Sequence, residues 1–151
     1  MLARREQILS RIEALLDAVE GVETVARNRG LLDNDARPAL VLMDGDEALK
    51  VSGGGRGRGK MSASILTMRP QVFVVLKLRK PQNALVGQDL NAFRTDVVRA
   101  LADDATLVTL VGTSGDIVYE GCETDLKSGM QVEGQMRLDF AITTVMDPYA
   151  N

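Results

Sequence analysis

The sequence has no histidine, no tryptophan and a single cysteine, Cys122, among its 151 residues. Without histidine, the chain lacks the residue that most often transfers protons near pH 7 and the commonest metal ligand. Ser-His and Cys-His nucleophile pairs and histidine-containing zinc sites are therefore excluded. One cysteine cannot form an intrachain disulfide, so the sequence does not require an oxidising compartment. We expect Cys122 to be a buried or half-buried structural thiol, because a reactive thiol needs a cationic neighbour to lower its pKa.

Aromatic residues and long apolar runs are also scarce. The aromatic residues are Phe73, Phe93, Tyr119, Phe140 and Tyr149. The three phenylalanines fall on apolar faces of the predicted elements, so we interpret them as core residues rather than base-stacking residues. The longest apolar run, residues 72–76, is far shorter than the ~20 residues that span a bilayer. No apolar segment follows the charged N-terminal residues, so we expect no signal peptide and no membrane contact.

The length and the charge are those of one ordinary domain. A chain of 151 residues can bury roughly 70% of its unfolded surface in one core, so we expect a single domain over residues 1–151. The formal net charge is −3, which gives the chain no general attraction to nucleic acid or anionic lipid. Any contact with a polyanion must therefore be local.

The clearest strand pattern lies near the C-terminus, from Gln131 to Val145. Apolar residues occupy the even positions from 136 to 142, whereas Arg137 and Asp139 fall between them, which is typical of a strand with one buried face. A second run, Val72–Leu78, is apolar on both parities until Lys77, as in a central strand. Further extended segments are expected at 22–27, 38–47, 63–68, 107–111 and 117–120, with the GTSG loop joining the last two as a hairpin and residues 124–129 turning into the final strand.

Two segments have helical periodicity. In residues 3–20 the apolar stripe ends at Gly21, a natural residue after a helix C-terminus. In residues 87–102 the apolar face ends at Asp103 and Asp104, which we interpret as solvated helix-end charges. The order of helix, strands, helix and strands predicts an α+β fold, with a mainly antiparallel or mixed β-sheet and two principal helices in a single domain.

A glycine-rich basic segment, VSGGGRGRGKM, occupies residues 51–61. Its five glycines remove any preference for helix or strand, so we predict a flexible loop at about 52–61. Arg56, Arg58 and Lys60 are the candidate contacts of this loop with a subunit, another partner or DNA.

The same loop has part of a nucleotide-binding motif. Gly54, Gly59 and Lys60 have the spacing of a phosphate-binding P-loop. However, Met61 stands where that motif needs serine or threonine, and the following ASILTM predicts a strand rather than the required helix. A nucleotide-dependent enzyme is therefore disfavoured.

Clustered carboxylates give no metal or catalytic site. Asp44, Asp46 and Glu47 lie close together in the sequence, as do Asp33 and Asp35, but neither group has the spacing of a calcium loop. We interpret these residues as turn residues at strand ends. The sequence predicts no catalytic residue, no metal site and no cofactor.

Over nearly its full length the sequence resembles the tail terminator, or minor tail protein U-like, family of long-tailed bacteriophages and phage-like gene transfer particles. The resemblance rests on an N-terminal helix before VETV and on the segments RPALVLMDGDE, MRPQVFVVLKL, DLNAFRTDVVRAL, DIVYEGCETDL and GQMRLDFAITTVMDPY.

The resemblance implies a structural virion protein rather than an enzyme. Such a subunit assembles as a hexameric ring at the head-proximal end of the tail tube, stops polymerisation of the tube protein and offers a surface to the head-tail connector protein. DNA passes through the ring without sequence-specific binding. The expected location is the virion tail, and the host cytoplasm during assembly. Two alternatives remain: a head-tail connector or stopper protein, and a small nucleic-acid-binding module that uses the basic loop.

Overall fold

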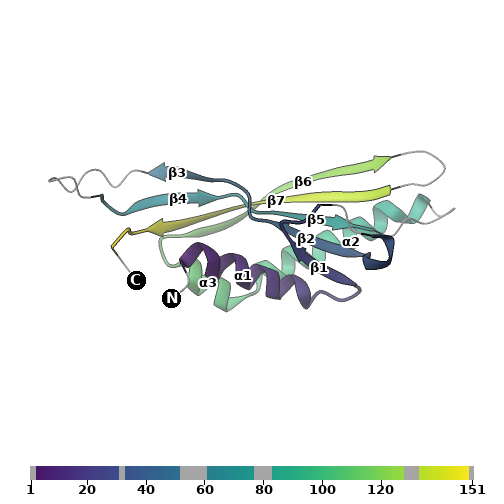
Figure 1. The fold of residues 1–151 in the computed structure, drawn as a ribbon, viewed down its shortest axis with the longest axis horizontal. Coiled ribbons are helices and arrows are strands. Elements are labelled where there is room, and N and C mark those ends of the chain that lie inside the picture. The colour runs from purple at the N-terminus through teal and green to yellow at the C-terminus, as the bar shows by residue number, and fades with distance from the viewer. Residues whose placement is uncertain (1–2, 31–32, 52–60, 77–82, 128–132, 150–151) are drawn as a thin grey trace.

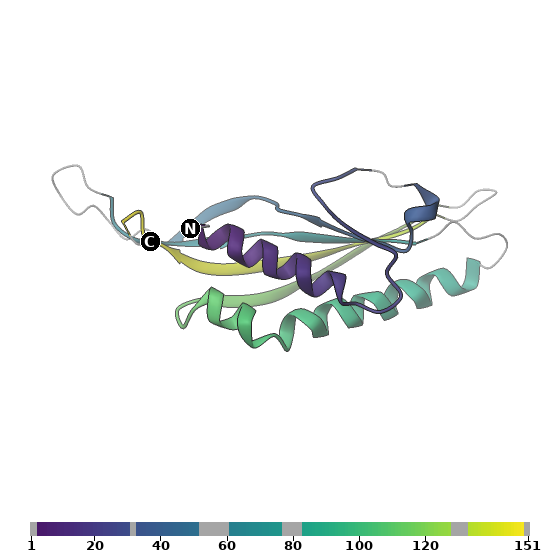
Figure 2. The same cartoon turned by 60° about the horizontal axis from the view of Figure 1, so that its bottom comes forward.

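The structure is a computed structural model that describes residues 3–30, 33–51, 61–76, 83–127 and 133–149. Its elements are α1 (Arg4–Asp17), β1 (Thr24–Arg27), the 3-10 turn η1 (Asn34–Ala36), β2 (Ala39–Met43), β3 (Glu47–Val51), β4 (Ser64–Met68), β5 (Gln71–Val75), α2 (Asn83–Ala102), α3 (Ala105–Val111), β6 (Asp116–Lys127) and β7 (Glu133–Met146). The helices lie along one face of an elongated, seven-stranded mixed sheet (Figures 1 and 2). The predicted α+β class is therefore confirmed.

Strand β7 is the central element of the sheet. Along one edge it pairs antiparallel with β6, and along the other it pairs first with β5 and then with β4. From β5 the sheet continues to β2 and β1, and from β4 it continues to β3. The β1–β2 pair is parallel, whereas the other described pairs are antiparallel. The outer edges are thus β6 on one side and β1 with β3 on the other.

The strands β2–β3 and β4–β5 form the two sides of one long hairpin, and both sides bend at the same level. The bend lies at residues 44–46 on one side and at Arg69–Pro70 on the other, where the Arg69 N–H donates to the Asp46 carbonyl at 2.9 Å. Gly45 has φ +70°, and a Cβ at this position would lie 1.9 Å from the Arg69 carbonyl oxygen. Only glycine fits there. Beyond the bend, β3, β4 and residues 142–146 of β7 form a projection, here called the arm, which extends past the helices (Figure 1).

The core lies between the helices and the inner face of the sheet. Its fully buried members include Ile8, Leu9, Ile12 and Leu16 of α1, Leu90, Val97 and Leu101 of α2, Leu107 of α3, and Leu40, Leu42, Met68, Val72, Val74, Leu138, Phe140 and Ile142 of the strands. Phe140 thus belongs to the core, as predicted, and the partly buried Phe93 packs against the core. Phe73 is only half-buried, because it alternates with Val72 and Val74 and faces away from the helices.

One predicted strand is wrong. Residues 107–111 belong to the helix α3 and not to a hairpin with 117–120, so the GTSG loop joins a helix to β6. The Asp104 side chain caps this helix by accepting a hydrogen bond from the Leu107 N–H at 2.7 Å. Leu107 and Val111, four residues apart, are both buried, which is the helical spacing. The helical spacing is hard to recognise in the sequence, because the apolar run is short and rich in β-branched residues, which favour strands.

Four other expectations need correction. Residues 124–127, predicted as a turn, continue β6 and pair with residues 133–136 of β7. Helix α2 begins at Asn83 rather than at 87, and α1 ends at Asp17, three residues before the expected end. Cys122 is exposed rather than buried, because it lies on β6, the outer edge strand of the sheet. The C-terminal strand is confirmed from Glu133 and extends to Met146, one residue beyond its predicted end.

We predict that Gly45→Ala destabilises the protein by roughly 2 kcal/mol or more, because the new methyl group would collide with the Arg69 backbone at a positive φ. Gly87→Ala is the matched control, since no atom lies within 4 Å of its Cβ position in α2. It should stabilise the protein by up to ~1 kcal/mol through helix propensity. Urea unfolding followed by circular dichroism measures both values, and equal effects would contradict the role of the bend.

Candidate functional site

The candidate residues Arg56, Arg58 and Lys60 lie outside the described residues. The described chain on both sides shows where they are attached. Strand β3 ends at Val51 and β4 begins at Ser64, both at the end of the arm that lies away from the bend. The basic segment therefore connects the two strands of the arm at its outer end.

The arm exposes apolar side chains. Leu49 of β3 pairs with Leu66 of β4, and Met146 of β7 lies on the same face, which is also the face of the buried Met68. Leu49 is 57% exposed and Met146 is 38% exposed, because the helices end before this part of the sheet. Exposed apolar groups that gather in this way mark interaction sites in soluble proteins.

The apolar surface continues at the outer end of the arm. Met61 and Tyr149 are 60% and 56% exposed. The Met61 N–H donates to the Tyr149 hydroxyl at 3.2 Å, which joins the chain before β4 to the segment after β7. Sequence reasoning missed this surface because the exposure of these residues depends on how the chain folds and not on a local sequence pattern.

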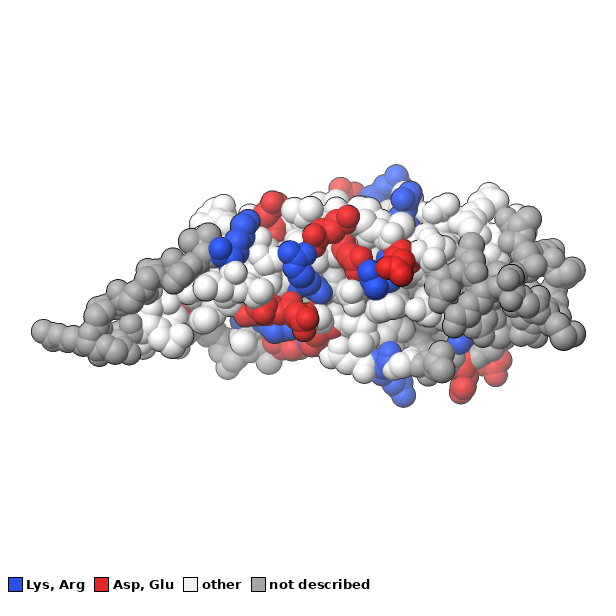
Figure 3. Space-filling model, turned by 90° about the horizontal axis from the view of Figure 1, so that it is seen from above, with Lys and Arg blue, Asp and Glu red and all other residues white. Residues whose placement is uncertain are grey.

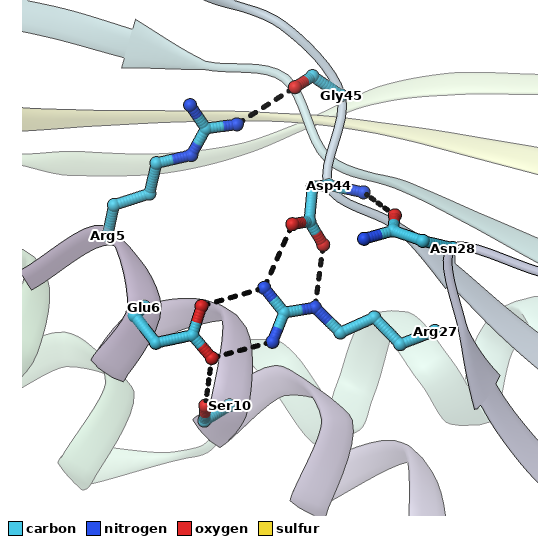
Figure 4. A network of polar contacts seen from close by, with 7 residues as sticks. All are labelled: Arg5, Glu6, Ser10, Arg27, Asn28, Asp44 and Gly45. Carbon is cyan, nitrogen blue, oxygen red and sulfur yellow. Dashed lines mark hydrogen bonds and ion pairs between the residues drawn. The ribbon is translucent and has the colours of Figure 1, made fainter. Parts of the chain in front are cut away.

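A polar clamp holds the base of the arm, and its centre is Arg27 of β1 (Figure 4). The guanidinium donates two hydrogen bonds to Glu6 of α1, at 2.7 and 2.9 Å, and two to Asp44 at the bend, at the same distances. Ser10 donates to Glu6 at 2.9 Å, and the Asn28 side chain accepts from the Asp44 N–H at 3.0 Å. The clamp therefore connects α1, β1 and the bend.

A second contact joins α1 to the arm. Arg5 donates to the Gly45 carbonyl at 2.9 Å and forms an ion pair with Glu47, the first residue of β3, at 3.3 Å. Asp44 and Glu47, predicted to be turn residues at strand ends, thus fix the direction in which the arm leaves the body. No sequence pattern relates them to Glu6 and Arg27, which lie far away along the chain.

The clamp remains ionised over a wide pH range. Hydrogen bonds from Arg27, and then from Ser10, lower the pKa of Glu6 from 4.5 to about 2. Hydrogen bonding by Arg27 also lowers the pKa of Asp44. In turn, the two carboxylates raise the pKa of Arg27, first Glu6 and then Asp44. The Arg27 side chain is only 19% exposed, so its charge is largely removed from water. Both carboxylates are needed to compensate for this loss of hydration.

An apolar groove, here called the α3 groove, lies on the helix-covered face, at the edge of the sheet opposite to β3. It has a volume of about 310 Å³ and runs between the C-terminal part of α2, α3 and the start of β6. Its apolar lining includes Val98, Leu101, Val108, Val111, Ile117 and Tyr119, and its charged lining residue is Asp116. The ring of Tyr119 packs against Phe140 at a centroid distance of 5.6 Å. Burial and the neighbouring Cys122 raise the pKa of Tyr119.

A second pocket, of about 280 Å³, lies on the face of the sheet away from the helices. Val41, Met43, Phe73 and Val75 line it together with Arg29, Arg37 and Gln135.

Charges of both signs alternate over the middle of the molecule seen from above, and the described residues form no patch of one sign on this side (Figure 3). Several carboxylates are paired with arginine, as in the contacts of Asp104 with Arg11 and of Asp139 with Arg137.

Grouped metal ligands and membrane-spanning helices are both absent from the described residues. Within the described ranges, no three His, Cys, Asp or Glu side chains are grouped so that they could hold a metal ion. None of the helices in this part of the chain is both long and apolar enough to cross a membrane.

No protein-family model matches the sequence, and no curated protein is significantly similar to it.

We predict that Glu6→Gln lowers the melting temperature at pH 7 and that the difference from the wild type narrows between pH 4.5 and pH 2. The pKa of Glu6 is lowered on folding, so ionised Glu6 stabilises the fold above about pH 4.5, and this stabilisation is lost as the pH falls toward 2. Scanning calorimetry over this range measures the effect.

Glu13→Gln is the control, because Glu13 lies on the same helix but takes no part in the clamp. At pH 7 it should lower the melting temperature less than Glu6→Gln does. A Glu6→Gln difference that is constant from pH 7 to pH 2 would show that the charge of Glu6 does not stabilise the clamp.

Proposed function

We propose that the protein is a structural subunit that forms a hexameric ring at the head-proximal end of a phage-like tail tube. There it would end the polymerisation of the tube protein and provide the surface to which the head docks. The observation that supports this most directly is the clamped arm, whose exposed apolar face extends past the helices. A rigid projection with apolar side chains is suited to packing against another subunit.

The positions of the arm and the α3 groove also support an assembly role. A ring needs heterologous contacts that close after a fixed number of copies. In this chain the exposed arm includes the edge strand β3, while the α3 groove adjoins the opposite edge strand, β6. Two different surfaces on opposite edges are what a head-to-tail contact requires. The sequence resemblance to tail terminators points to the same kind of assembly.

The partners in this proposal are further copies of the chain, the tail tube protein, the head-tail connector protein and the DNA that passes through the lumen. Arg56, Arg58 and Lys60 are the residues we propose to contact a neighbouring protein or DNA phosphates. Contacts to phosphates alone hold DNA without reading its sequence.

A head-tail connector or stopper protein is the alternative closest to this function. It would use the same arm and the same kind of ring contact, at a neighbouring position in the particle. A free-standing nucleic-acid-binding module is less well supported, because charges of both signs are mixed over the described surface in Figure 3.

Removal of the gene from a particle-producing genome tests the proposal. We expect overlong tails without heads, because nothing would then stop the polymerisation of the tube. Electron microscopy of the lysate gives tail length and head attachment separately. Tails of normal length beside unattached or emptied heads would indicate the connector instead, and intact particles would refute both structural functions.

The basic loop gives a second prediction. Replacing Arg56, Arg58 and Lys60 together with glutamine should weaken DNA binding by the assembled ring and reduce the slope of log K against log salt by about 2 to 3, because three phosphate contacts are lost. The control replaces three exposed cations elsewhere, Arg4, Arg29 and Arg99, and so changes the net charge equally. Equal effects of the two triple variants would mean that the loop has no specific contact with DNA.

A further inference from the structure

We propose that the pocket beside Phe73, on the face of the sheet away from the helices, binds a small organic acid. The apolar body of the ligand would lie on the strands, and its carboxylate would meet Arg29 and Arg37. This pocket is here called the arginine pocket. The site is additional to the proposed assembly function and does not rest on it.

The floor of the arginine pocket is apolar and belongs to two paired strands. Val41 of β2 lies opposite Phe73 of β5, and Val75 follows on the same face of β5. Val41 is only 4% exposed, although it is not a member of the core between the helices and the sheet. A second layer of the chain therefore covers this part of the face away from the helices.

The connection between β1 and β2 forms this covering layer. It contributes Arg29 near its start and Arg37 near its end to the lining of the pocket. The residue before Arg29 and the residue after Arg37 are each held by a backbone hydrogen bond of 2.8 Å, the first to Leu42 of β2 and the second to Glu23 before β1. Both arginines are therefore attached at fixed points beside the apolar floor.

The charge of the pocket is positive. Its charged lining residues are the two arginines, and the described lining includes no carboxylate. Arg29 is exposed, and no hydrogen bond or ion pair joins its side chain to another described residue. A guanidinium binds a carboxylate through two parallel hydrogen bonds. The pocket is therefore suited to an anion, although the chain as a whole has a net charge of −3.

The volume of the pocket indicates a small ligand. It is about 280 Å³, which is the liquid volume of about nine water molecules. Sites for small molecules are mainly apolar, largely preformed cavities with a few polar groups that orient the ligand. Gln135 provides one further polar side chain here. An acid with one aromatic ring or a short hydrocarbon chain has the required size and polarity.

The α3 groove is a natural comparison within the same molecule. Its volume of about 310 Å³ is similar and its lining is also mainly apolar, but none of its described lining residues is cationic. A ligand that the arginines hold should therefore prefer the arginine pocket. A ligand that only apolar contact holds should enter both.

Binding of three probes to the full-length protein tests the site. Phenylacetate has a ring and a carboxylate, phenylacetamide has the ring without the charge, and acetate has the carboxylate without the ring. We expect phenylacetate to bind with a dissociation constant of about 1 mM or lower, and the other two at least about tenfold more weakly. In two-dimensional NMR titrations phenylacetate should shift the amide signals of Val41, Phe73 and Val75, but not those of Val108 and Val111 in the α3 groove.

Two variants locate the carboxylate of the ligand. Arg29→Gln and Arg37→Gln should each weaken the binding of phenylacetate about tenfold, because a charge-assisted contact is lost. Arg4→Gln is the matched control, since it removes the same charge from an exposed residue of α1 that does not line the pocket. It should leave the dissociation constant unchanged. Circular dichroism shows whether each variant is folded.

Several results would overturn the proposal. Equal affinities for phenylacetate and phenylacetamide, or an unchanged affinity in both folded pocket variants, would show that the arginines do not hold the carboxylate. An equal affinity for acetate would show that the apolar floor takes no part. Shifts confined to the α3 groove, or no binding of phenylacetate at about 10 mM, would exclude the site for small acids. Binding of a peptide that ends in phenylalanine, without binding of phenylacetate, would assign the pocket to a protein partner instead.

Discussion

The close approach of Gly45 to the Arg69 carbonyl is the constraint on which the shape of the molecule depends. It bends both sides of the long hairpin at one level, while β7 passes the bend as one uninterrupted strand that pairs with β5 before it and β4 after it. Pro70 has no N–H to donate at this point, but its carbonyl still accepts from the Phe140 N–H at 3.1 Å, which keeps β7 attached. The body and the arm are therefore one continuous sheet with a fixed angle between them.

The clamp around Arg27 fixes the orientation of the arm more than it stabilises the fold. Its carboxylates are partly exposed, and ion pairs of this kind contribute little free energy singly. However, the planar guanidinium donates to two carboxylates in fixed geometry, so α1, β1 and the bend cannot rotate independently. Lysine could not do the same, because an ammonium group lacks the fork that holds two carboxylates at once. In the proposed ring, where the arm would meet a neighbouring subunit, a fixed orientation of this kind would be needed.

The sequence was sufficient for the parts of the fold that depend on local period. The alternation around Leu138 located β7, and the helical stripes located α1 and α2 within a few residues. It failed at α3, where Asp104 as N-cap, the four-residue spacing of Leu107 and Val111, and Gly112 at the end were the available indications. The exposure of Leu49 and the clamp could not be predicted, because both depend on residues that meet only after folding. Arg56, Arg58 and Lys60 stay untested predictions.

The exposed arm follows from where the helical layer stops. Helix α1 begins at Arg4, and Arg5 already contacts Gly45 and Glu47 at the bend, so the first turn of the helix lies at the base of the arm. The face that buries Met68 at the base of the arm therefore continues outward to the half-buried Leu66 and the exposed Leu49. An apolar sheet face is buried against another layer in stable folds, and in the proposed ring a neighbouring subunit would cover this one.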